Sequence, residues 1–262
     1  VAHRLDDVVG PALAQAEILA DAAARYPDNV ALRYPGTAQA AAGRSMTYRE
    51  VDEWSSKLAR VLINRGLGAE DLVAVSIPRS VESVLAVWAV SKTGAAVVPI
   101  DPHYPADRIA HMLSDSGAKV GLTLDVERPN LADDVEWLVV DGPLGEQMIA
   151  GVSGAPIDAE ERVRPLTTAH PAWVIYTSGT TGPSKGCMIS YNYMCNLARL
   201  QLRAGPANEN DITITPLPLF HMNAMCVGVL ASILVGARVA FVPRFSVSNF
   251  WPEVERSGAT IA

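Results

Sequence analysis

The residues with the clearest chemical potential form one short segment that reads YTSGTTGPSKG, from Tyr176 to Gly186. Its glycines allow backbone conformations that other residues rarely adopt, and its hydroxyl groups can donate hydrogen bonds to anionic oxygens. Lys185 adds a full positive charge. Together these groups could surround a polyphosphate. The structural alternative is a polar turn between two buried strands, but so many hydroxyls beside a lysine favour phosphate binding.

Two other nucleotide-binding motifs do not match. A Walker loop has glycine directly before its lysine and serine or threonine directly after it, whereas Ser184 and Gly186 flank Lys185 here. A Walker loop also opens a helix, while this segment is followed by an apolar run that starts at Cys187. A second glycine-rich segment, RGLGAED, has Asp71 where a dinucleotide fingerprint requires its third glycine.

Amphipathic helices alternate with short apolar runs along the chain, and this alternation predicts a layered α/β fold. Thr47 and Glu50 form a capping-box pattern at the start of one helix, and Gly66 provides its stop. Residues 141–171 have a loop-like composition, and the phosphate segment connects two strands. Helices are expected over residues 11–25, 48–65, 80–94, 105–117, 191–203, 222–235 and 247–256, and strands over residues 72–77, 95–100, 119–124, 137–140, 172–177, 186–190, 211–215 and 237–242.

Composition limits the possible partners. With 262 residues, 49% of them hydrophobic, the chain can form one large domain or two small ones, and the similar patterns on the two sides of residues 141–171 favour one. Its net charge of −7 gives no general attraction to nucleic acid or to an anionic membrane. The apolar stretch 222–242 is interrupted by Gly236 and Arg238, so no membrane span is expected.

Cysteine usage and the N-terminus suggest a reducing compartment. The three cysteines are odd in number and lack the spacing of a zinc site, so a disulfide framework is not expected; they are Cys187, Cys195 and Cys226. Residues 1–10 lack the apolar core of a secretory signal, which favours the cytoplasm. Four histidines have no metal-ligand spacing, so no metal site built from protein imidazoles is expected; they are His3, His103, His111 and His170.

The phosphate segment resembles the phosphate-binding motif of the adenylate-forming (AMP-binding) superfamily, which includes acyl-CoA synthetases, nonribosomal-peptide adenylation domains and luciferases. Two further segments support the resemblance. KTGAAVVPID, from Lys92 to Asp101, is similar to the family's KAGAAYVPID, and PLFHMNA, from Pro218 to Ala224, is similar to the PLFH segment of acyl-CoA ligases. The resemblance extends from about Ala20 to the last residue.

This resemblance implies a ligase that uses ATP and Mg²⁺ to convert a small-molecule carboxylic acid into an acyl-adenylate, and then transfers the acyl group to a thiol. Lys185 and His221 are the candidate catalytic residues. His221 would border the acyl pocket, or alternatively it is hydrogen-bonded beneath the start of a helix. The residues implied to hold the β and γ phosphates are Thr177, Ser178, Gly179, Thr180, Thr181, Gly182 and Lys185.

Three interpretations of the chain's function remain open, two of them enzymes of this family and one a non-catalytic protein. The leading one is an acyl-CoA synthetase with coenzyme A as the acceptor. The second is a peptide-synthetase adenylation domain that loads a carrier protein, and the third is a non-catalytic nucleotide-binding remnant. Residues 46–176 look most like peptide synthetases, whereas the chain from Thr180 onward is more similar to acyl-CoA ligases, as in a recombined, engineered or divergent protein.

The domain expected from the resemblance is the N-terminal part of an AMP-binding domain over residues 1–262, with the small C-terminal domain absent. A chain of this kind is expected to be incomplete for catalysis, because the family's further motifs have no match in it. The final GATIA sequence is expected to be a turn that leads into a new strand.

Overall fold

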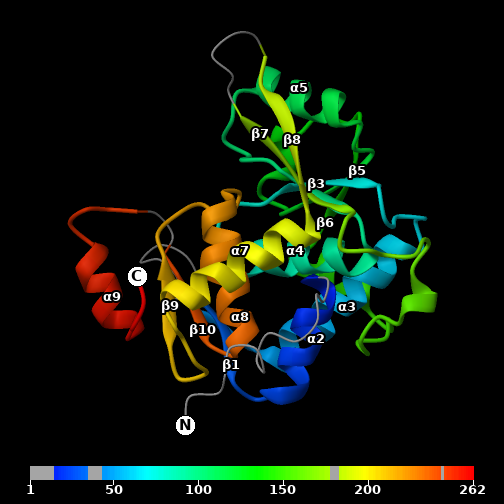
Figure 1. Ribbon diagram of the computed structural model, residues 1–262. Helices are drawn as coiled ribbons and strands as arrows, with labels where there is room; N and C mark the ends of the chain where they lie inside the picture. The colour runs from blue at the N-terminus through cyan, green and yellow to red at the C-terminus, as the bar shows by residue number, and fades with distance from the viewer. Residues whose placement is uncertain (1–14, 35–42, 178–182, 243–244) are drawn as a thin grey trace. The chain divides into compact units, whose positions relative to one another are not determined.

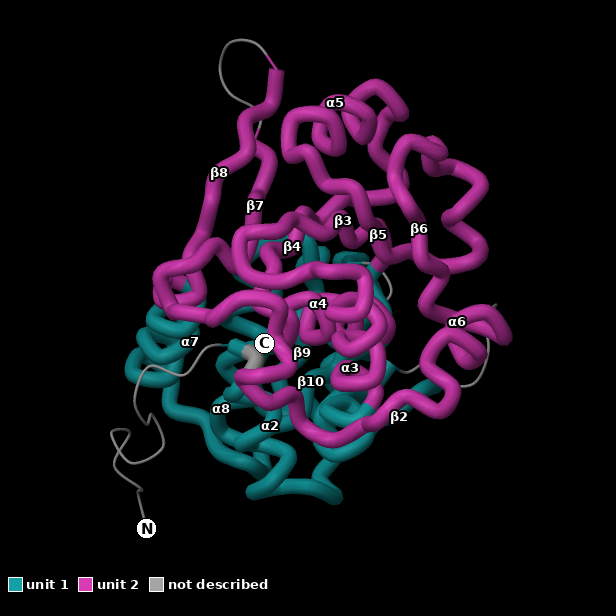
Figure 2. The backbone as a smooth tube through the Cα atoms, turned by 90° about the vertical axis from the view of Figure 1, so that its right-hand side faces the viewer, with its two compact units in different colours: residues 1–53, 79–81, 194–262 teal, residues 54–78, 82–193 magenta. Residues whose placement is uncertain are grey.

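The computed structural model describes residues 15–34, 43–177, 183–242 and 245–262 (Figure 1). The chain divides into two compact units (Figure 2). Unit 1 contains residues 1–53, 79–81 and 194–262, and unit 2 contains residues 54–78 and 82–193. Each unit contains one β-sheet, as expected for an α/β fold.

The sheet of unit 2 has six strands in the order β6-β5-β3-β4-β7-β8. The first five strands are parallel, and β8 runs antiparallel to β7. In the middle of the sheet, Val73 lies opposite Val97 on one side and Val120 on the other. The strands are β3 (Leu72–Ser76), β4 (Ala96–Pro99), β5 (Val120–Thr123), β6 (Glu136–Val139), β7 (Pro171–Thr177) and β8 (Lys185–Ser190).

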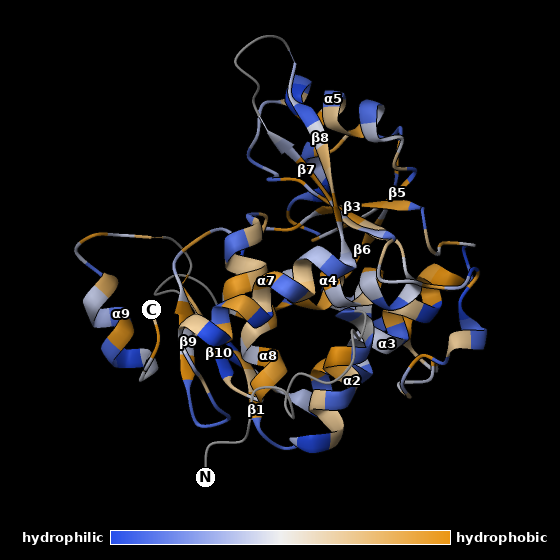
Figure 3. Cartoon of the chain, in the orientation of Figure 1, coloured by the Kyte–Doolittle hydropathy of each residue, from blue (hydrophilic) through white to orange (hydrophobic). Residues whose placement is uncertain are grey.

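Continuous apolar runs explain why the central strands of this sheet form. All four residues of β4 and of β5 are buried, as expected for parallel strands that are covered on both faces. Figure 3 shows β3 and β5 as strongly hydrophobic segments. The helices in or entering this unit are α3 (Tyr48–Ile63), α4 (Val81–Thr93), α5 (Ala106–Ser116) and α6 (Gly142–Ile149), with short 3₁₀ turns η1 (Arg128–Asn130) and η2 (Ala159–Glu161).

Local signals set the ends of two of these helices. The Thr47 backbone N–H donates to Glu50 Oε2 at 2.7 Å, and the Glu50 N–H donates to Thr47 Oγ1 at 3.2 Å, which confirms the predicted capping box. Helix α5 ends at Gly117, whose φ of 69° is left-handed and whose N–H donates to the carbonyl of Leu113. Glycine adopts this conformation at little cost, so the helix stops where the sequence predicted.

The sheet of unit 1 has four strands in the order β2-β1-β10-β9. They are β1 (Val30–Tyr34), β2 (Arg44–Thr47), β9 (Ile212–Thr215) and β10 (Arg238–Phe241). Ile261 forms an isolated parallel bridge with Thr213, so the strand expected after Gly258 begins beside β9. The remaining helices are α2 (Gln15–Arg25), α7 (Tyr191–Ala204), the π-helix η3 (Asn223–Leu230), α8 (Ala231–Val235) and α9 (Phe250–Ser257).

Three features differ from the sequence-based expectations. Strands β1 and β2 were not predicted, because β1 has no alternating pattern and pairs with the distant β10, where Leu32 lies opposite Val239. Helix α6 lies within the expected loop 141–171; its Pro143 is tolerated because the first helical N–H groups need no partner. The expected helix 222–235 begins as the π-helix η3 and becomes α-helical only at Ala231.

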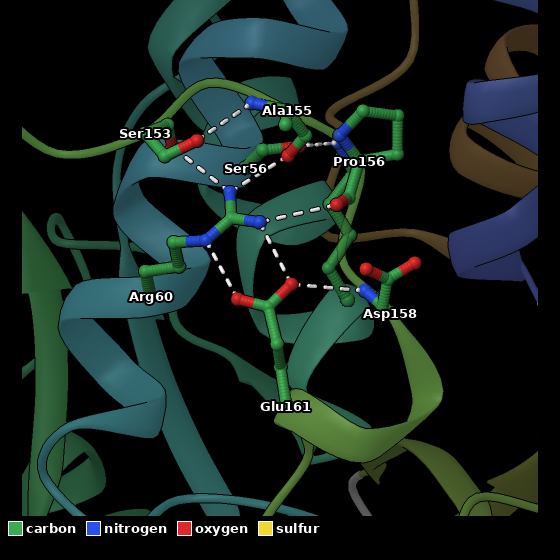
Figure 4. A network of polar contacts seen from close by, with 8 residues as sticks. Ser56, Arg60, Ser153, Ala155, Pro156, Asp158 and Glu161 are labelled. Carbon is green, nitrogen blue, oxygen red and sulfur yellow. Dashed lines mark hydrogen bonds and ion pairs between the residues drawn. The ribbon is translucent and has the colours of Figure 1, made fainter.

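Arg60 of α3 holds part of the expected loop in place (Figure 4). All five guanidinium N–H groups donate. Two of these bonds go to the Glu161 carboxylate, both at 2.8 Å, and the others go to backbone carbonyls. The carbonyl acceptors belong to Ser153, Ala155 and Pro156. Charge-assisted hydrogen bonds from one arginine thus help to hold residues 153–161, most of which are exposed or only partly buried.

No helix in the part of the chain that the structure describes is both long and apolar enough to cross a membrane. This agrees with the interruption of the stretch 222–242 by Gly236, which has a left-handed φ of 77° and ends α8.

Candidate phosphate-binding site

The two ends of the phosphate segment meet at the β7–β8 hairpin of unit 2. Thr177 is the last residue of β7, Lys185 is the first residue of β8, and they are cross-strand partners. Both side chains are exposed. Five of the predicted phosphate-binding residues lie outside the described residues: Ser178, Gly179, Thr180, Thr181 and Gly182. The structure therefore brings together the two predicted residues that flank them.

Gly186, the residue that follows Lys185 in the sequence, lies close to β7. It is the cross-strand partner of Tyr176. A Cβ atom at position 186 would lie 2.9 Å from Val174 Cγ1 and 3.2 Å from Tyr176 Cζ. The glycine that follows the lysine thus leaves room for the Tyr176 ring, and a larger residue would force the Val174 or the Tyr176 side chain to move.

Helix α5 lies beside this hairpin (Figure 1), where it contacts β8 and, through Asp115, Tyr176 of β7. The Tyr176 hydroxyl donates to Asp115 Oδ2 at 2.7 Å, and His111 Nε2 lies 2.8 Å from the carbonyl oxygen of Ser184. The His111 ring also meets the Tyr176 ring edge-on, with 6.2 Å between their centroids. Neither α5 residue was predicted to belong to the site. Their spacing of four on one predicted helix was the available signal, because such residues share a face.

The environment of Tyr176 keeps its hydroxyl protonated. Burial, followed by the hydrogen bond to Asp115 and the charge of that carboxylate, raises the pKa of Tyr176 well above its usual range. The phenol therefore remains a donor to Asp115, and this contact joins α5 to β7 across the physiological pH range.

His221, the second predicted catalytic residue, lies in unit 1 just before η3. Its side chain is exposed, and its ring centroid is 4.8 Å from that of Phe220. Its backbone N–H donates to the carbonyl of Pro218 at 3.0 Å, and its own carbonyl accepts from Met225 at 3.3 Å. The backbone, rather than a buried imidazole, thus makes the hydrogen bonds that order the start of this helix.

The described residues provide no cage for a metal ion, since they contain no group of three or more His, Cys, Asp or Glu side chains placed to coordinate one. Burial raises the pKa of the Cys195 thiol to about 11 and that of the Cys226 thiol to about 12. These two cysteines therefore stay protonated near neutral pH and are poor nucleophiles and poor metal ligands there. Cys187 is exposed on β8.

Comparison with known proteins assigns the chain to a family. The model of the family described as AMP-binding enzyme matches residues 19–262. Phosphinothricin tripeptide synthetase PhsB of Streptomyces viridochromogenes is 38% identical over 204 residues, which are 77% of this chain and 16% of PhsB. Surfactin synthase subunit 1 of Bacillus subtilis is 34% identical over 233 residues, which are 88% of this chain and 6% of that protein. The chain thus spans a small part of these relatives.

Solved structures show the same fold. The N-terminal subdomain of Klebsiella oxytoca NpsA, in complex with 3-hydroxybenzoyl-AMSN, matches with a TM-score of 0.76 and 27% identity, over 94% of this chain and 58% of that one. A Mycobacterium tuberculosis fatty acyl CoA synthetase matches with a TM-score of 0.77 and 23% identity, over 92% of this chain and 47% of that one, which concerns the fold alone. With a family match over nearly its whole length, the chain belongs to the AMP-binding enzyme family.

Proposed function

We propose that the β7–β8 hairpin binds the β and γ phosphates of ATP, and that the chain contributes this site to the activation of a carboxylic acid as an acyl-adenylate. The observation that carries the proposal is the pairing of Thr177 with Lys185 at the two ends of the YTSGTTGPSKG segment, in a chain of the AMP-binding enzyme family. A hydroxyl and an ammonium group are both exposed there, and both can donate to phosphate oxygens.

The proposed reaction explains why these groups are needed. A carboxylate oxygen of the acid attacks the α-phosphorus of ATP, the bond from that phosphorus to the bridging oxygen of the β-phosphate breaks, and pyrophosphate leaves with the electron pair. Negative charge builds up on the leaving group, and a preorganised cation stabilises it in the transition state. Lys185 is the residue proposed for this role, together with the backbone and hydroxyl donors of residues 177–182.

Magnesium fits this proposal as an ion carried by the nucleotide. Mg²⁺ retains several waters and is usually held by substrate phosphates with one or two carboxylates. The absence of a three-residue ligand group among the described side chains is compatible with that arrangement. When bound, the ion would neutralise part of the triphosphate charge, while Lys185 orients the leaving pyrophosphate.

Two thiol acceptors follow from different observations. The relatives described above include peptide synthetases, and a related structure is an artificially fused adenylation–PCP di-domain, which favours a thiol on a carrier protein. The PLFHMNA segment around His221 resembles acyl-CoA ligases and favours coenzyme A. In either case we place His221 beside the acid or its adenylate, since its ring is exposed rather than part of the core.

Binding measurements test the first part of the proposal. Isothermal calorimetry with MgATP, followed by competition with inorganic pyrophosphate, is expected to show one site that the two ligands share. Binding of ATP that pyrophosphate cannot displace would contradict the placement of the β and γ phosphates at the hairpin. The acceptor is tested with the protein as the gene encodes it, by comparing transfer of labelled acids to coenzyme A and to a phosphopantetheine-bearing carrier protein.

A further inference from the structure

A hydrogen bond joins the middle of α5 to the start of β8. His111 Nε2 and the Ser184 carbonyl oxygen are 2.8 Å apart. A carbonyl oxygen can only accept, so Nε2 carries the hydrogen and donates it. The two residues are 73 positions apart in the chain, and the contact therefore depends on the tertiary fold.

The acceptor belongs to the peptide unit that leads into Lys185. The Ser184 carbonyl and the Lys185 nitrogen are parts of one planar group, because the peptide bond between them has partial double-bond character. A bond that holds the Ser184 oxygen thus also limits the rotation of the plane from which Lys185 starts. The lysine side chain is flexible but of fixed length, so its ammonium group can reach only a limited region around its Cα atom, and the backbone determines where that region is centred.

Apolar packing contributes little to holding this part of β8. Lys185, Gly186, Cys187 and Met188 are all exposed, and the Met188 side chain retains 72% of its accessible surface. Within the described residues, strand β8 is also the last strand of its sheet, with β7 as its single neighbour. What holds its first residues is therefore the ladder with β7, together with the polar contact that α5 makes to Ser184.

The same helix holds the opposite strand. The Tyr176 hydroxyl donates to Asp115, one turn after His111 on α5, and the His111 ring packs edge-on against the Tyr176 ring. Helix α5 thus holds the hairpin at two positions, Tyr176 and Ser184. These residues are the direct neighbours of Thr177 and Lys185. An anchor of this kind orients functional side chains without touching the ligand.

We propose that His111 is a positioning residue, which holds Lys185 in the orientation required for phosphate binding through its hydrogen bond to Ser184. This role rests on the phosphate-binding function proposed above. It predicts that the hydrogen bond, rather than the bulk of the imidazole, sets the affinity for pyrophosphate.

Two substitutions of His111 distinguish the effect of its hydrogen-bond donor from the effect of its aromatic ring. His111→Phe keeps an aromatic ring against Tyr176 but removes the N–H group, whereas His111→Gln removes the ring but keeps a nitrogen donor of similar reach. With pyrophosphate and Mg²⁺ as the probe, calorimetry should show about three- to tenfold weaker binding for His111→Phe, the range expected for one net hydrogen bond. His111→Gln should recover affinity to within about twofold of the wild type.

A matched control makes the same chemical change elsewhere in unit 2. The His103 ring bonds Asp101 at 3.0 Å rather than the hairpin, so His103→Phe should leave the affinity for pyrophosphate unchanged. Wild-type affinity in His111→Phe, alongside weaker binding in Lys185→Ala, would overturn the proposed role of His111. Equal losses in His111→Phe and His111→Gln would show that the hydrogen bond is not the cause.

Hydrogen exchange provides a readout that needs no ligand. Peptides covering residues 183–187 should exchange faster in His111→Phe than in the wild type, because the local opening free energy falls, and should be unchanged in His103→Phe. If Lys185→Ala binds pyrophosphate as well as the wild type, the proposed phosphate site is wrong, and exchange alone then tests the anchor. Unchanged exchange in His111→Phe would overturn the anchor as well.

Discussion

Lys185 lies directly opposite Thr177 in the antiparallel pairing of β7 with β8, so both ends of the phosphate segment leave the sheet at the same place. Residues paired in this way have Cα atoms only about 4.5 to 5.5 Å apart. One ligand oxygen group can therefore meet donors from both strands.

Lys185→Ala should weaken the binding of pyrophosphate and of ATP by about tenfold or more. A hydrogen bond to a charged group typically contributes about 1.5 to 3 kcal/mol, and the exposed side chain has little structural role to lose. Calorimetry on folded protein measures the change. Lys119→Ala, at an exposed lysine next to β5, is the control and should bind as the wild type does. Equal affinities in all three proteins would contradict the phosphate site.

In the protein as the gene encodes it, His221→Ala should change the dependence of adenylate formation on the acid, measured as pyrophosphate release with a panel of acids, with little loss of stability. Because the side chain is exposed, the free energy of unfolding is expected to change by less than about 0.5 kcal/mol. Leu230→Ala, at a fully buried leucine of η3, should instead cost about 2 to 5 kcal/mol. Chemical denaturation measures both. A loss in His221→Ala comparable with that of Leu230→Ala would assign the histidine to the core.

Gly186→Ala should destabilise the hairpin by about 1 to 3 kcal/mol. The added methyl group would meet Val174 and Tyr176 at distances that force one of them to move. Gly205→Ala is the control, since only Gln201 atoms at 3.9 Å lie near its added methyl group. Thermal unfolding should therefore show a clear decrease in Tm for the first variant and little change for the second. Similar melting of both would mean that β7 and β8 adjust freely.

Glu161→Gln should lower stability near neutral pH and have progressively less effect in acid. The hydrogen bonds from Arg60 are the main reason that the pKa of Glu161 lies below its usual range. A depressed folded-state pKa stabilises the protein fully above the unfolded value of about 4.3, and this contribution is lost as the pH falls through the folded value.

The ion pair between Arg60 and Glu161 is partly exposed. The free energy of unfolding at pH 7 is therefore expected to differ by about 1 kcal/mol between the wild type and Glu161→Gln. Urea unfolding between pH 3.5 and 7 should show the wild type and the variant converging toward low pH. Glu136→Gln, which removes the more exposed partner of Arg65, should give a smaller difference at pH 7. A gap that stays constant with pH would exclude the ionised pair as its source.

Features governed by neighbouring residues were predictable from the sequence. The capping box of Thr47 and Glu50, the stop of α5 at Gly117 and the buried strands β4 and β5 depend on contacts within a few residues or on continuous apolar runs. The phosphate segment was recognisable for the same reason, because its glycines, hydroxyls and lysine are contiguous. Family membership, which the comparison with known proteins confirms, followed from that segment.

Features that join distant segments were decided only by the tertiary structure. Strand β1 is stabilised by its pairing with β10, about two hundred residues later, and its own five residues carry too weak a pattern to predict it. The contact between His111 and Ser184 likewise exists only because α5 lies beside the β7–β8 hairpin. Local propensity acts over a few residues, whereas pairing and packing select partners by shape and hydrogen bonding across the whole chain, and that selection placed His111 of α5 against the carbonyl oxygen of Ser184, the residue before Lys185.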